Sequence, residues 1–151
     1  MIKLTLILCT TIFCNSTDSL EQKAVDYFFN TIFRVDYQGY KVIEFRNQTD
    51  TARYYGIHKC ENWDAYTKNL IVSTSPGEST DVKVNAKGIN VKNVRQNSAR
   101  LKVYVYSKVK IGASYFVSIV VYKKLHFVNY YLIQFNENGD IIDMCQTGEI
   151  I

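Results

Sequence analysis

The second half of the chain alternates between apolar and polar residues, and this period of two limits its fold more than any other feature. In 100-RLKVYVYSKVKI-111, the odd-numbered positions are aliphatic except for Ser107, and the even-numbered positions carry four cations and two tyrosines. Successive side chains of a strand point to opposite faces, so this stretch predicts a strand with one buried face. Similar runs, separated by turn residues, predict strands near 81–85, 89–94, 99–111, 114–124, 127–136 and 140–146.

The first half of the chain carries a helical pattern instead. Ser19 and Gln22 have capping-box spacing, and apolar residues recur with the helical period from Leu20 to Phe33. This pattern predicts a helix with one broad apolar face, which must be buried against something large. The pattern then predicts a strand over 40–46 and a short helix over 62–70, which is capped by Asn62.

Together these elements predict an α+β fold, in which an N-terminal helix packs on a curved antiparallel β-meander of about six strands. In the order of its elements the chain resembles the cystatin-like and NTF2-like folds. Such folds host enzymes, inhibitors and binding modules alike, so the resemblance implies a shape rather than a function. The alternative is a closed β-barrel with a helix cap, because six strands of this length can curl shut.

The register of the two longest predicted strands follows from matching their apolar faces. A three-residue loop at 112–114 sets Val105 opposite Val121 and Val109 opposite Val117, which makes the apolar face continuous. The helix is then expected to pack on this face, with Val109 in the core.

The N-terminal residues predict export from the cytoplasm. Residues 1–16, MIKLTLILCTTIFCNS, place one lysine before an apolar run of about ten residues, as in a secretory signal peptide. Residues 17–151 then form a single domain that is secreted or periplasmic. A lipid anchor at Cys14 is the alternative, although bulky Phe13 departs from the small residue expected before a lipidated cysteine.

Two cysteines remain beyond the predicted signal peptide. Cys60 and Cys145 form an even pair, and an oxidising compartment favours a disulfide between them. The alternative is two buried free thiols that pack as small apolar side chains.

Charge is distributed unevenly along the chain. Between Asp81 and Glu137 the sequence has ten Lys and Arg residues and no acid. We therefore predict a secreted or envelope-associated, non-catalytic binding module whose basic, tyrosine-rich sheet face contacts an acidic protein or polysaccharide. The residues of this predicted face are Arg100, Lys102, Tyr104, Tyr106, Lys108, Lys110, Tyr122 and Lys124. In the alternative, acids of the first half, such as Glu44, fold against the sheet and neutralise it.

Motifs that carry chemistry are absent from the sequence. It has no P-loop, nucleophile elbow or HExxH motif, and its two histidines do not have zinc-site spacing, so we predict no cofactor and no metal site. The enzymatic alternative is an NTF2-like pocket, which also suits a small ligand, with Asp26 or Asp143 as general base. Nucleic acid is disfavoured as a partner because the chain carries a predicted signal peptide and lacks an RNP-like motif.

Overall fold

The computed structural model describes residues 18–48, 56–78, 80–92, 101–123 and 127–150. The predicted signal peptide and Cys14 lie outside these residues. Within the described ranges, none of the helices has the length and apolar character needed to span a membrane.

The N-terminal helix is continuous but contains a wider turn at its centre. It comprises α1 (Leu20–Tyr27), a π-helical turn (Phe28–Ile32) and α2 (Phe33–Asp36). The Ser19 hydroxyl accepts a hydrogen bond from the Gln22 N–H at 3.1 Å, which confirms the predicted N-cap.

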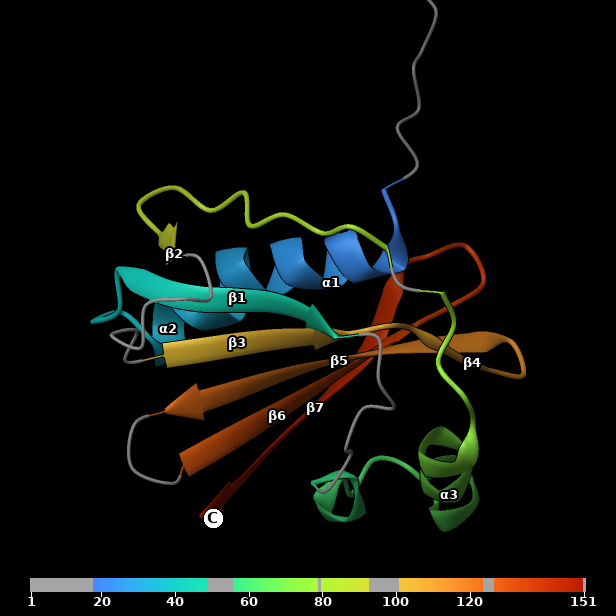
Figure 1. Cartoon of the computed structure of the whole chain (residues 1–151). Coiled ribbons are helices and arrows are strands. Elements are labelled where there is room, and N and C mark those ends of the chain that lie inside the picture. Colours follow the sequence, from blue (N-terminus) through green and yellow to red (C-terminus); the bar gives the residue numbers. More distant parts are fainter. Residues whose placement is uncertain (1–17, 49–55, 79, 93–100, 124–126, 151) are drawn as a thin grey trace, which may run out of the picture.

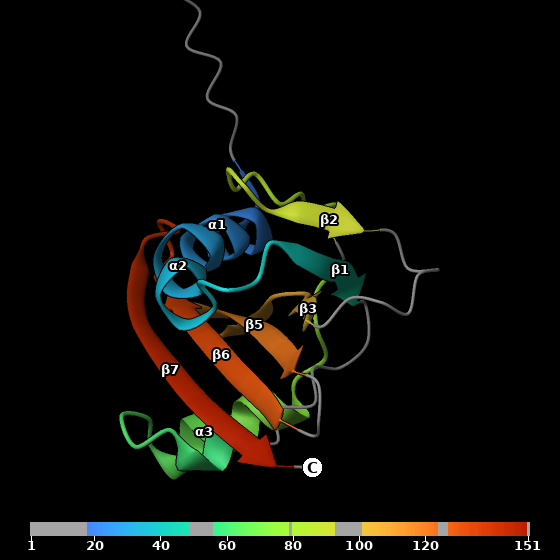
Figure 2. The same cartoon turned by 90° about the vertical axis from the view of Figure 1, so that its left-hand side faces the viewer.

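One open, mixed sheet forms the rest of the framework (Figures 1 and 2). Its strands run in the spatial order β2-β1-β3-β5-β6-β7, and β4 extends the sheet beside β5. The α+β fold is thus confirmed, and the closed barrel is not formed. The bounds are β1 (Val42–Gln48), β2 (Asn90–Lys92), β3 (Leu101–Tyr106), β4 (Val109–Ile111), β5 (Ser114–Lys123), β6 (Phe127–Phe135) and β7 (Ile141–Ile150).

The sheet departs from a simple meander at one side, where β1 pairs in parallel with both β2 and β3. The strand predicted over 81–85 is wrong, because these residues form no ladder and instead run along the outside of α1 (Figure 1). The Gln22 side chain bonds the backbone N–H and C=O of Lys83 there, and Val82 enters the core. The alternation in this segment therefore reflects packing on a helix rather than on a strand.

The predicted register also needs correction. Val105 pairs with Ile119, and Val109 pairs with Phe116, so four steps along one strand match three steps along the other. One extra residue near Ser107 makes this irregularity, and such a bulge turns the following side chains to the opposite face. Val109 consequently lies away from the helix, contrary to prediction.

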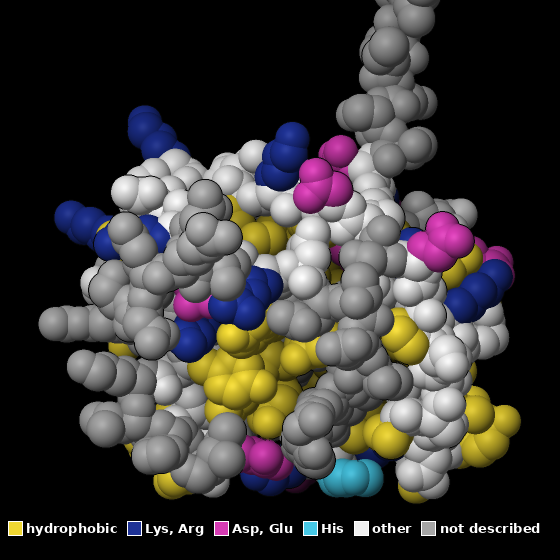
Figure 3. Space-filling view, in the orientation of Figure 1, with side chains coloured by type: hydrophobic (Ala, Val, Ile, Leu, Met, Phe, Trp, Pro, Cys, Tyr) yellow, Lys and Arg dark blue, Asp and Glu magenta, His cyan; other side chains and the backbone are white. Residues whose placement is uncertain are grey.

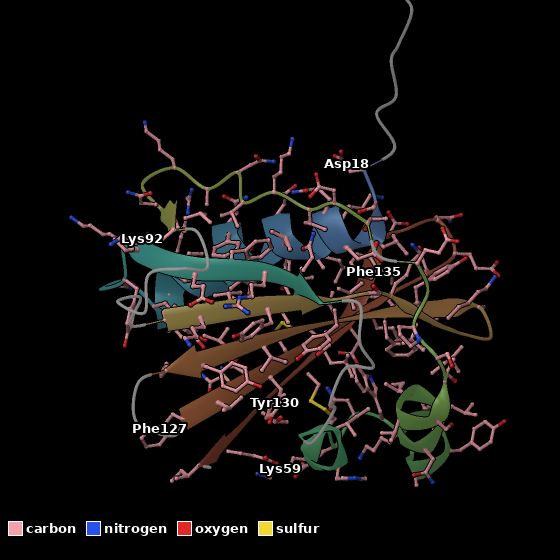
Figure 4. All side chains as sticks on the ribbon, viewed as in Figure 1. Asp18, Lys59, Lys92, Phe127, Tyr130 and Phe135 are labelled. Carbon is pink, nitrogen blue, oxygen red and sulfur yellow. A yellow bond between two sulfur atoms is a disulfide. The ribbon has the colours of Figure 1, made fainter. Side chains whose placement is uncertain are left out.

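Each face of the sheet carries its own buried cluster. On the helix face, Phe28 and Phe29 pack with strand residues such as Val103 and Phe135. On the opposite face, Trp63 and Phe116 belong to a second cluster that also includes Tyr130. Figure 4 labels Phe135 and Tyr130, which belong to these two clusters.

A short segment covers part of the second cluster. It contains a 3-10 turn (Ile57–Lys59) and α3 (Ala65–Ser73), on the side of the sheet away from α1 (Figure 1). The predicted cap at Asn62 is wrong, since the Asp64 side chain accepts from the Thr67 N–H at 2.8 Å and α3 begins one residue later. The predicted Cys60–Cys145 disulfide is confirmed and ties this segment to β7. Such a bond fits an extracellular or periplasmic protein.

Candidate functional site

The structure separates the residues of the predicted basic face. Lys102, Tyr104 and Tyr122 share the face opposite the helix, as their cross-strand pairing shows. Arg100 and Lys124 lie outside the described residues. Tyr106 is on this face too, but it is only 9% exposed and belongs to the second cluster.

Lys108 and Lys110 follow the bulge and do not join that face. Lys108 donates from both its backbone N–H and its Nζ to Glu21 on α1, at 3.0 and 3.4 Å. The Nζ of Lys110 lies 5.2 Å from the ring centroid of Tyr115, which packs against the helix-face cluster. The expectation of one exposed face from 100 to 124 is therefore wrong for these two lysines, because the sequence pattern does not reveal the bulge.

An acid from the first half of the chain reaches the remaining part of the predicted face. Glu44 on β1 is 3% exposed and pairs with Arg46 at 2.6 Å and with Lys102 at 3.9 Å. Arg46 also lies over the ring of Tyr104, and burial raises the pKa of that phenol. Figure 3 shows basic and acidic side chains beside a group of hydrophobic ones in this region. Lys102, the described cation of the predicted face, thus already has an anionic neighbour in Glu44.

A different site lies between the end of the helix and the loop that precedes β2. This aromatic groove has a volume of about 280 Å³ and is open to solvent. Figure 2 shows α2 and the start of β2 on the side of the molecule that contains it. The groove is lined by Phe29, Phe33, Arg34, Tyr37, Gln38, Tyr40, Lys41, Ala86, Lys87, Gly88 and Ile89.

The floor of the aromatic groove consists of rings from the helix. Phe29, Phe33 and Tyr37 recur at intervals of four residues, which places them on one side of the helix. The ring centroids of Phe33 and Tyr37 lie 5.3 Å apart in a stacked arrangement, and that of Tyr40 lies 6.3 Å from Tyr37. Phe29, Phe33 and Tyr37 are each at most 3% exposed, so the floor is firmly packed.

The opposite wall is a turn held to the start of β1. Ile89 donates from its N–H to the Ala86 carbonyl at 3.3 Å, and Asn90 donates to the Lys41 carbonyl at 2.8 Å. Gly88 has a φ of +86°, a conformation that strains other residues. The turn at 86–89 therefore forms one side of the aromatic groove.

The rim of the aromatic groove is basic. Arg34, Lys41 and Lys87 are all exposed, and within the described ranges none of the three forms an ion pair. Arg34 contacts only the Asn30 amide oxygen among the described hydrogen bonds, at 3.4 Å. Three cations around an apolar floor favour an anionic ligand with an apolar part.

A polar network fixes Tyr37 from behind. Its hydroxyl lies 2.8 Å from that of Tyr131 and accepts from the Asn129 amide at 2.7 Å, while Tyr131 donates to Asp36 at 3.2 Å. The Nζ of Lys123 lies 4.7 Å from the centroid of the Tyr37 ring. Burial raises the pKa of both phenols, and the hydrogen bond to Tyr37 adds to the effect at Tyr131. Both hydroxyls therefore stay protonated at neutral pH, and the ring is held in place.

The carboxylates proposed for a catalytic pocket lie elsewhere. Asp26 accepts from the Gln22 amide at 3.0 Å, and Asp143 accepts from the Trp63 indole at 2.8 Å. Neither residue lines the aromatic groove. Among the described side chains, no group of three His, Cys, Asp or Glu residues is placed to hold a metal ion.

Comparisons with protein-family models, with curated proteins and with solved structures found no match for this chain.

The sequence pattern does not reveal the aromatic groove, although both of its sides leave a signal. The helix side shows Phe29, Phe33 and Tyr37 at regular spacing, and the other side is the turn around Gly88. What brings them together is the parallel pairing of β1 with β2, which matches Val42 with Asn90. A pairing between segments so far apart in the chain leaves no local pattern.

Proposed function

We propose that this protein is an exported, non-catalytic binding module that holds an anionic partner at the aromatic groove. The observation that carries the proposal is the basic rim of Arg34, Lys41 and Lys87, which no described acid neutralises, around an aromatic floor. The class of partner is the one expected from the sequence, but the surface is different.

Binding is favoured over catalysis by the chemistry of the lining. The described residues around the aromatic groove supply rings, cations and one amide, without a carboxylate, histidine or cysteine. General acid–base and nucleophilic chemistry most often depends on those missing groups. The packed floor and hydrogen-bonded wall suit a preformed binding surface, because little conformational entropy is lost when a ligand arrives.

The test is affinity for a polyanion as a function of salt, with heparin as the probe. A triple variant, Arg34→Gln with Lys41→Gln and Lys87→Gln, removes the rim charges and leaves the floor intact. Because exposed charges contribute about 0.2–1 kcal/mol each, we expect heparin affinity to fall about tenfold and its salt dependence to weaken.

The control changes net charge equally at other places. Lys68→Gln with Lys102→Gln and Lys110→Gln removes three exposed or half-exposed cations, none of which lines the aromatic groove. This variant should bind heparin nearly as well as the natural chain. Equal losses in the two variants would mean that binding follows net charge alone, and an absence of binding to the natural chain would also refute the proposal.

A further inference from the structure

The dimensions of the aromatic groove restrict what its apolar part can hold. A buried apolar cavity of about 150 Å³ accepts benzene, whereas sites for whole small molecules usually measure about 300–1,000 Å³ and enclose most of the ligand. At about 280 Å³, and open to solvent, the groove has room for one aromatic group but does not enclose a larger molecule. The rest of the ligand must lie outside, beside the rim.

The rim indicates what that outer part carries. Arg34 comes from the helix, Lys41 directly precedes β1 and Lys87 comes from the turn, so cations come from three segments around the same floor. A ligand that inserts an aromatic group therefore meets positive charge on more than one side. An acidic polypeptide provides both an aromatic side chain and flanking carboxylates, whereas an acidic polysaccharide lacks the aromatic group.

We propose that the aromatic groove binds an acidic polypeptide segment that inserts one aromatic side chain between the helix and the turn. This inference rests on the proposed function and names its partner. Buried aromatic anchors contribute much of the binding energy in many protein interfaces, whose rims are polar. Tyr40 and Ile89, which are partly exposed, form the contact surface for the anchor, and the buried ring of Phe33 also lines the groove.

The site is prepared for such an anchor before binding. The hydrogen bonds to Asn129 and Tyr131 fix Tyr37, and the backbone bond from Asn90 to Lys41 fixes the turn opposite. A rigid floor and wall reduce the conformational entropy that is lost on binding. More of the free energy gained by burying one side chain therefore remains as binding free energy.

The experiment compares three synthetic probes by calorimetry on the full mature chain. The first is a capped heptapeptide with a central phenylalanine between aspartates, the second has alanine at the centre, and the third keeps the phenylalanine but replaces every aspartate with asparagine. Burial of a phenylalanine side chain is worth about 1.5–3 kcal/mol, so the alanine probe should bind about 10- to 100-fold more weakly. The asparagine probe should also bind more weakly, and its binding should not depend on salt.

A filling variant locates the binding site. Ala86→Leu adds apolar volume within the lining without removing a cation, so it should weaken the phenylalanine probe and leave heparin affinity unchanged. If this variant does not fold, competition on the natural chain by 2-naphthalenesulfonate, an aromatic anion of suitable size, replaces it. Competition should displace the phenylalanine probe, and a failure to displace it would contradict the inference.

The outcomes separate the two proposals. Heparin binding without preference for the phenylalanine probe would overturn the polypeptide partner and keep the anionic one. Binding of 2-naphthalenesulfonate alone, with no peptide binding, would point to a small aromatic anion and would also overturn the inference. Failure of every anionic probe would refute the proposed function itself.

Discussion

On the helix face of the sheet, one continuous helix buries several aromatic rings against aliphatic strand residues, whereas on the opposite face a short segment is held by a disulfide and a few side-chain contacts. Phe28 and Val103 on the helix face are fully buried. Across the sheet, the segment from Ile57 to Ser73 buries Ile71 and is also linked to β7 through Cys60 and the Trp63 hydrogen bond. Both sides therefore bury apolar side chains, but the segment opposite the helix is also attached to β7 by a covalent bond and a side-chain hydrogen bond.

The two regions also differ in whether their cations have acidic neighbours. Opposite the helix, Glu44 lies within 4 Å of both Arg46 and Lys102. Around the aromatic groove, Arg34 and Lys87 have no such described acid. A concentration of lysines in the sequence is thus a poor guide to a binding surface unless the acids of distant segments are also placed.

The largest expected effect is the loss of a ring from the helix-face core. Phe28→Ala should destabilise the fold by about 3–5 kcal/mol, because Phe28 is fully buried and contacts other rings, including that of Tyr131 at 5.1 Å between centroids. Chemical denaturation measures the change. Tyr66→Ala is the control, since Tyr66 is 73% exposed, and it should have almost no effect. Similar losses in both variants would contradict the described core.

Removal of the disulfide should have the next largest effect and should act mainly on the opposite face. Cys60→Ala with Cys145→Ala opens a covalent loop with a sequence separation of 85 residues, for which the chain-entropy model gives an upper loss of about 4.6 kcal/mol, and removal of such bonds typically costs about 2–5 kcal/mol. The entropic loss accelerates exchange through global unfolding in all elements, so the discriminating observation is exchange through local opening, which should accelerate most in residues 57–73 and least in α1. Equal acceleration of local opening in both regions would show that the two faces do not differ in the proposed way.

A smaller effect is expected from the indole of Trp63. Trp63→Phe keeps a ring beside Phe116 but removes the hydrogen bond to the Asp143 carboxylate, which should cost about 1.5 kcal/mol. Since this bond and the disulfide attach the same segment, the two changes should not be additive in denaturation experiments. Additive losses would mean that the attachments act independently.

Alkaline pH should weaken the helix face gradually. Burial holds the pKa of Tyr131 and of Tyr37 above the value of about 10 expected in the unfolded chain. The protonated phenols therefore contribute stability that is fully present below pH 10 and is lost as the pH rises above it. Tyr131→Phe should reduce the slope of stability against pH in this range, and an unchanged slope would exclude Tyr131 as its source.

The sequence was sufficient to predict elements with strong local signals. The apolar spacing from Leu20 and the Ser19 cap predicted the helix, and the alternation predicted β3, β5 and β6. The Cys60–Cys145 pairing also followed from number and compartment. The helix and the strands form from residues that lie near one another in the sequence. The disulfide could be predicted because only two cysteines remain beyond the predicted signal peptide.

Features that depend on distant contacts could not be predicted in this way. The bulge near Ser107 changes which face Lys108 and Lys110 occupy, although the alternation continues through it. The aromatic groove depends on the pairing of β1 with β2 across more than forty residues, as Val42 with Asn90 shows. Neither the bulge nor the pairing of β1 with β2 changes the local alternation of apolar and polar residues, so neither could be predicted from it.

The central claim is that an anionic partner binds at the aromatic groove rather than on the strand face first predicted from the alternation. Titration of the isotope-labelled chain with the acidic phenylalanine heptapeptide, followed by amide chemical shifts, tests it most directly. We predict that the largest shifts occur at 33–41 and 86–90, with little change at Lys102, Tyr104 and Tyr122. Shifts concentrated at those three residues, with the aromatic groove unaffected, would contradict the account.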